Sequence, residues 1–154
     1  MVVHDSLEPW WAVLTVWGVV NLVNVLQGSG FVSRVVSGTR AINHALGFGI
    51  ILLVIPALAA LVALRSAGWL GWAGPATFVA FVALLVWVDY AFPVEFRSPP
   101  RASILVPYLT LFFGSILLMG LQMFTMDRRL WVVTVATTAL HLGAMGLAMM
   151  RGVG

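Results

Sequence analysis

The sequence predicts an all-α integral membrane protein, a compact bundle of five transmembrane helices. Hydrophobic residues make up 62% of the 154 residues and charged residues only 8%, whereas a soluble domain has about 45–50% apolar and about 25% charged residues. Five segments reach the roughly 20 mostly apolar residues that a helix needs to cross the hydrocarbon core. We place them at about 9–27, 41–64, 71–92, 103–124 and 130–150. Because the connections are short, we expect one transmembrane domain over residues 1–154.

The first three helices are bounded by polar residues and by proline. We expect the first helix to end at Gln27, because glycine, serine and arginine dominate residues 28–40. The second helix contains Pro56, which can kink it, and ends before Arg65. The third helix ends at Pro93, because proline has no N–H to continue the helical hydrogen bonds.

The last two helices follow polar connections. The fourth helix begins after Arg101 and carries Pro107 in its first turns, where proline is tolerated. The fifth helix follows residues 126–129, which include one aspartate and two arginines. Small residues let membrane helices approach closely, and we assign this packing role to Gly114, Gly143, Gly146 and the pair Ala59 and Ala60.

The charge pattern excludes several classes of function. The net charge is +3, but the basic residues are eight arginines scattered among the connections, with no lysine and no basic face. Nucleic acid is therefore excluded as a partner, because its binding needs clustered positive charge. The absence of cysteine excludes disulfides, thiol catalysis and thiolate metal sites. The first residues lack a basic segment and a cleavage site, so we expect no removable signal peptide.

The arginines and tryptophans give an orientation in the membrane. Five arginines lie on the side that holds the C-terminus and three on the other side, which favours a cytoplasmic C-terminus and an outside N-terminus in the cell membrane. Tryptophan gathers at the opposite interface, as an aromatic belt does. These tryptophans are Trp10, Trp11, Trp69, Trp72 and Trp131.

Polar residues within the predicted helices gather in the half of the bilayer nearer the C-terminus. With a rise of about 1.5 Å per residue, His44 and Asp89 lie about 5 Å inside the helix ends, Asn24 about 6 Å and His141 about 13 Å. Their helical spacing turns each polar edge toward the other helices. We predict a polar pocket lined by Asn21, Asn24, His44, Asp89, Tyr108 and His141.

Asp89 and His44 are the candidate catalytic residues of this pocket. A carboxylate inside an apolar helix is costly and marks a functional site unless it is paired. Beside His44 at matched depth, Asp89 would fix the imidazole tautomer and form an acid/base pair. The alternative is that Asp89 pairs with Arg97 or Arg101 at the membrane surface. For the asparagines and for His141, the alternative is hydrogen bonding between helices.

Arg97 and Arg101 complete the candidate ligand-binding residues, which also include Asn21, Asn24, Tyr108 and His141. If the pocket opens toward the loop after Pro93, the two guanidinium groups can hold a phosphate or carboxylate in a bidentate manner. Glu95 lies two residues before Arg97 and is its nearest charged neighbour in the sequence.

Three function classes remain open. The first is a binding protein or enzyme for a lipidic ligand such as an isoprenoid, a quinone or a lipid, with Asp89 and His44 as acid and base. The second is a non-catalytic accessory or assembly subunit of a membrane complex, or a transporter component, with another membrane protein or a second copy as partner. The third is an electron-transfer subunit in which His44 and His141 ligate one haem b. No closely spaced metal-binding motif is present.

Overall fold

The computed structural model describes residues 9–38, 41–66, 68–94, 96 and 101–153. Every regular element in these ranges is a helix, and five helical segments are long and apolar enough to cross a membrane. They are Trp10–Ser37, Ile42–Ala63, Gly68–Ala91, Ala102–Met126 and Arg128–Met150. The prediction of an all-α chain with five helices of membrane-spanning length is therefore confirmed.

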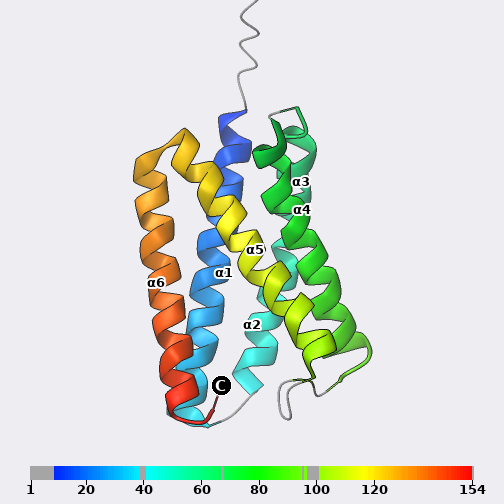
Figure 1. Cartoon of the computed structure of the whole chain (residues 1–154), viewed down its shortest axis with the longest axis vertical. Helices are drawn as coiled ribbons and strands as arrows, with labels where there is room; N and C mark the ends of the chain where they lie inside the picture. Colours follow the sequence, from blue (N-terminus) through cyan, green and yellow to red (C-terminus); the bar gives the residue numbers. More distant parts are fainter. Residues whose placement is uncertain (1–8, 39–40, 67, 95, 97–100, 154) are drawn as a thin grey trace, which may run out of the picture.

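Helix α1 (Trp10–Ser37) occupies the middle of the bundle (Figure 1). It contacts α2 (Ala41–Leu52), α3 (Val54–Ala63), α5 (Ala102–Met126) and α6 (Arg128–Met150). Its buried face repeats every three to four residues, as an amphipathic helix requires. The residues of this face are Ala12, Val13, Val16, Val19, Val20, Val23 and Asn24.

Helix α4 (Gly68–Leu85) packs against α3 and, more extensively, against α5, which crosses the bundle diagonally in Figure 1. Two phenylalanines of α4, Phe78 and Phe81, are fully buried, and the ring of Phe81 lies 5.1 Å from that of Phe112 on α5. At the closest approach, Gly74 faces Met119, and a Cβ added to Gly74 would lie 3.0 Å from the backbone nitrogen of Met119. This contact leaves no room for a side chain at position 74 of α4.

The glycines that the sequence suggested for close packing are not the ones that serve it. A Cβ added at Gly143 or Gly146 would meet no atom within 4 Å, and one at Gly114 would only touch a methyl group at 3.8 Å. That expectation is wrong for Gly143 and Gly146, because no atom of another helix lies close to them, whereas Gly114 makes only an ordinary contact with Thr77 of α4. Ala60, in contrast, is fully buried in α3.

The prediction that residues 28–40 form a connection is wrong for residues 28–37, because α1 continues to Ser37. Gly28 and Gly30 lie at helix contacts: an added Cβ would lie 3.5 Å from the Cα of His141 at the first and 3.3 Å from Asn43 at the second. The helix ends at Gly38, whose φ of 66° is left-handed and whose N–H donates to the carbonyl of Arg34 at 3.0 Å. Gly28 and Gly30 thus serve packing between membrane helices, whereas Gly38 ends α1.

Two other spans depart from regular α-helix. The second is interrupted at Leu53, whose N–H donates to the carbonyl of Ile50, three residues before Pro56. The third ends in the π-helical turn η1 (Val86–Ala91), where the N–H of Phe92 donates to the carbonyl of Trp87 at 2.9 Å. Pro93 explains this ending, because it has no N–H for the carbonyl of Asp89 and its ring would clash with that carbonyl in an α-helix.

The two ends of the bundle carry different side chains. The end at which α1 and α6 terminate and α2 and α5 begin is called the C-terminal end here (Figure 1). At the opposite end, Trp10, Trp11, Trp69 and Trp72 are exposed at the starts of α1 and α4. There Asp127 caps α6 by accepting a hydrogen bond from the N–H of Arg129 at 2.8 Å. The expected gathering of tryptophan at one end is confirmed.

Candidate functional site

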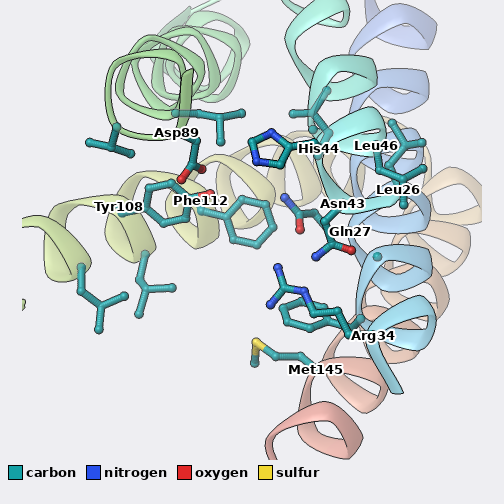
Figure 2. Close-up of a pocket in the computed structure, with 18 of the residues that line it drawn as sticks. Leu26, Gln27, Arg34, Asn43, His44, Leu46, Asp89, Tyr108, Phe112 and Met145 are labelled. Atoms are coloured by element: carbon teal, nitrogen blue, oxygen red, sulfur yellow. The ribbon is translucent and has the colours of Figure 1, made fainter. Parts of the chain in front are cut away.

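A cavity of about 770 Å³ lies at the C-terminal end of the bundle (Figure 2). Its lining comes from α1, α2, the last residue of α4, η1, α5 and α6, and from residues that follow η1 and α6. Polar and charged side chains share this lining with aliphatic and aromatic ones. The polar members are Gln27, Arg34, Asn43, His44, Asp89, Tyr90, Tyr108 and His141.

Arg34 brings a positive charge into the cavity from the last turns of α1. Its guanidinium donates to the amide oxygen of Asn43 on α2, while the amide nitrogen of Asn43 donates to the carbonyl of Gly30 at 3.0 Å. The guanidinium carbon also lies 5.4 Å from the ring centre of Phe31. These contacts join α1 to α2 and hold the arginine head at the cavity, where Figure 2 shows it pointing toward the open space.

Asp89 and His44 reach into the same space from two different helices (Figure 2). Asp89 sits in η1 and is partly buried, whereas His44 is exposed near the start of α2. Tyr90 links the two segments: its hydroxyl donates to the carbonyl of His44 at 2.9 Å, and its ring meets the imidazole edge-on at 5.5 Å. No hydrogen bond or ion pair joins the side chains of His44 and Asp89, both of which are described.

Tyr108 lies on α5 and is buried among aromatic rings. Its ring is 5.2 Å from those of Phe81 and Phe96, and in Figure 2 it lies beside Asp89. These ring contacts fix the tyrosine at the wall of the cavity.

His141 lines the cavity from α6 and is 1% exposed. Its ring stacks on Phe31 at 5.9 Å and on Phe113 at 6.4 Å, and it meets Phe112 edge-on at 5.4 Å. We call these three phenylalanines the aromatic box. The Nδ1 atom of His141 lies 3.3 Å from the amide oxygen of Asn24, whereas its buried Nε2 atom has no hydrogen-bond partner within the described ranges.

Asn21 and Asn24 lie in a hydrogen-bonded contact between α1 and α6, which we call the α1–α6 seam. The amide of Asn24 donates to Thr138 at 2.9 Å and to Thr137 at 3.3 Å. Asn21 donates to Thr134 at 3.2 Å and accepts from Thr137 at 2.7 Å. Neither asparagine lines the main cavity, although Asn24 borders a second, smaller groove with Thr137 and His141.

The depth assigned to Asn24 from the sequence is wrong. The value of about 6 Å followed from ending the first helix at Gln27, but α1 runs 13 residues beyond Asn24, or about 20 Å. Asn24 therefore lies at the level of His141, which it contacts.

The sequence-based candidates thus divide into three groups, one of which is the pair Asn21 and Asn24 in the α1–α6 seam. The cavity brings together His44, Asp89, Tyr108 and His141, which come from four different elements. Arg101 is exposed at the start of α5, and Arg97 and Glu95 lie outside the described residues. The direct pairing expected between His44 and Asp89 does not occur in the structure.

Sequence reasoning missed Gln27, Phe31, Arg34 and Asn43 as members of the cavity lining. The first three share one helix face, because they follow each other at intervals of four and three residues. Reading residues 28–37 as helix would have found them. Asn43 was considered only as a neighbour of His44 at a helix start.

The donor groups of the described residues bear on whether the protein can ligate a metal ion or haem. Within the described residues, no group of three or more histidine, cysteine, aspartate or glutamate side chains gathers in a way that could hold a metal ion. His44 and His141 both line the cavity, and their joint ligation of haem b stays a prediction. Comparisons with protein-family models, with curated proteins and with solved structures give no match to this chain.

Proposed function

We propose that this chain is an integral membrane protein that binds an amphipathic lipidic ligand in the cavity. Its side chains would donate a proton to the polar end of the ligand or accept one from it. One observation carries the proposal. A single cavity presents Arg34, His44 and Asp89, which we call the polar lining, together with apolar and aromatic walls. Convergent polar groups in a mostly apolar pocket are typical of a ligand site.

The polar lining supplies the groups that acid/base chemistry needs. Arg34 offers a fixed positive charge to an anionic or carbonyl oxygen of the ligand. The imidazole of His44 can serve as a proton donor or acceptor, and the carboxyl group of Asp89 can stabilise the imidazolium or accept a proton itself. Because the two side chains do not bond each other directly, the polar end of the ligand would lie between them.

The remaining walls suit the apolar part of such a ligand. Leu105, Leu109, Met145 and Met149 line the cavity from α5 and α6, and methionine side chains adapt to irregular apolar shapes. An isoprenoid, a quinone or a lipid fits this division between polar and apolar surface. An accessory subunit, the alternative, would have no need for the polar lining.

We expect replacing Leu109 with tryptophan to reduce the amount of lipidic ligand that copurifies with the protein. Leu109 lines the cavity and is 39% exposed, so a larger side chain there takes up cavity space without displacing the core. Filling a binding cavity should weaken binding by about 1–3 kcal/mol, or about fivefold or more. Extraction of the purified protein followed by lipid mass spectrometry measures the effect.

Leu117→Trp is the matched control, because Leu117 lies on the same helix, is 71% exposed and lines neither cavity. Equal lipid content in both variants and the unchanged protein would contradict the proposal. Recovery of a stoichiometric membrane-protein partner in the same preparations would then favour the accessory-subunit alternative.

We also propose that the C-terminal end faces the cytoplasm of a cell membrane, with five arginines against three supporting this orientation. The chain has no cysteine, so single cysteines report on each end without background. A membrane-impermeant maleimide should label Ser66→Cys in intact cells and Val153→Cys only after permeabilisation. The reverse pattern would invert the orientation.

A further inference from the structure

The hydrogen bonds of the α1–α6 seam fix the direction of the hydrogen bond between Asn24 and His141. The hydroxyl of Thr138 donates to the carbonyl of Thr134 at 2.8 Å, and that of Thr137 donates to Asn21. Both hydroxyl oxygens can therefore accept from the amide nitrogen of Asn24, as the distances of 2.9 and 3.3 Å show. This turns the amide oxygen of Asn24 toward His141.

An amide oxygen can only accept, so the hydrogen bond to Asn24 requires a proton on Nδ1 of His141. A second proton on Nε2 would give a buried cation, which is costly without a charged partner. The neutral ring with Nδ1–H and a lone pair on Nε2 is therefore the form that fits the seam. In this form, Nε2 is an acceptor only.

The surroundings of Nε2 supply no donor. The imidazole stacks between Phe31 and Phe113 and meets Phe112 edge-on, and phenylalanine offers no O–H or N–H. A buried acceptor without a partner calls for an explanation, because nearly all such atoms are satisfied. Since His141 also lines the cavity, a ligand there can reach the edge of the aromatic box.

We propose that Nε2 of His141 accepts a hydrogen bond from a neutral hydroxyl group of the bound ligand. This proposal rests on the proposed function and names the ligand class: an alcohol, phenol or quinol on an apolar body. A carbonyl, an ether or an ionised phosphate at the same place has no proton to donate, so its oxygen would repel the lone pair on Nε2. The lone pair of His141 thus selects hydroxyl compounds over their oxidised or methylated forms.

A metal ion is the other partner that the lone pair of a histidine can bind. A histidine that ligates a metal also donates its other N–H to a carbonyl or carboxylate oxygen, as Nδ1 of His141 does to Asn24. The donor groups favour the hydroxyl, because no cluster of further metal-binding side chains forms among the residues that the structure describes. A metal or haem at His141 is therefore treated as an outcome of the test.

The first arm of the test reads the tautomer without any added ligand. The full chain is labelled with ¹⁵N in its three histidine rings and studied by NMR in detergent micelles. We expect one ring, absent in His141→Phe, to show a protonated Nδ1 and an unprotonated Nε2. A ring with protonated Nε2 would overturn the proposal.

The second arm compares para-octylphenol with para-octylanisole, its methyl ether, as probes. The phenol should shift the Nε2 resonance of His141 and bind about tenfold more weakly to His141→Phe, the loss expected for one hydrogen bond. The anisole should cause no such shift and bind both proteins equally. Phenylalanine keeps the ring and its stacking, so this variant is expected to fold.

The outcomes separate the two proposals. If both probes bind, and bind less well to Leu109→Trp, but His141→Phe does not distinguish them, the hydroxyl subsite is wrong and the ligand cavity stands. If neither probe binds to the unchanged protein, the proposed function fails together with the subsite. An absorption band of haem that is lost in His141→Phe would overturn the hydroxyl proposal in favour of metal ligation.

Discussion

Replacing Gly74 with leucine is expected to prevent α4 and α5 from packing and to abolish the folded bundle. A Cβ at this position would lie 2.7 Å from the Cγ of Met119, 3.0 Å from its backbone nitrogen and 3.2 Å from its Cα. The side chain of Met119 can move, but its backbone cannot move without separating the two helices. Overpacking costs about 1–3 kcal/mol where neighbours can shift, and a leucine against a backbone should exceed that range.

The matched control is Gly143→Leu on α6, where an added Cβ meets nothing within 4 Å. There, leucine should preserve the fold and add about 1 kcal/mol of helix propensity. Size-exclusion chromatography in detergent after heating measures the folded fraction of each variant. If Gly74→Leu survives heating as well as Gly143→Leu, the close approach of α4 and α5 is wrong.

Asp89→Asn is expected to weaken ligand binding by about tenfold to a hundredfold while leaving the bundle folded. Asparagine keeps the shape of the side chain and removes the negative charge that η1 brings to the cavity. Hydrogen bonds to a charged group contribute about 1.5–3 kcal/mol. Because the asparagine amide can still donate and accept hydrogen bonds, we expect the variant to fold.

Asp127→Asn is the control for the charge change, because asparagine caps a helix about as well as aspartate and α6 begins at the opposite end of the bundle. Titration of each purified variant with the lipid identified by mass spectrometry gives the dissociation constants. Equal constants for the two variants would remove Asp89 from the binding site and leave it a structural role.

The fold class could be predicted because it depends on composition and on the length of apolar runs. The last two helices, expected at 103–124 and 130–150, match Ala102–Met126 and Arg128–Met150 within two residues at each end. The inward direction expected for the polar edge of the last helix was also correct, since His141 is buried against α1. Periodicity along one helix is a local property that a sequence displays directly.

The rest depends on contacts between helices. Gly28 and Gly30 suggested a loop, but they allow α6 and α2 to approach α1, so the helix continues and carries Arg34 to the cavity. For the same reason, the sequence could not tell that Asn24 bonds α6 or that Gly74 rather than Gly143 marks the closest helix contact. Equal distances from the membrane surface did not imply that His44 and Asp89 touch.

The π-helical turn η1 determines the direction in which the side chains at the end of the third span point. Each residue of an α-helix turns the chain by about 100°, so the wider turn at Val86–Ala91 changes the direction in which every later side chain leaves the axis. The direction in which the Asp89 carboxylate points therefore depends on the number of residues that precede it in the turn. Deletion of one of residues 86–88 would preserve the charge of the span and still turn the carboxylate of Asp89 away from the cavity.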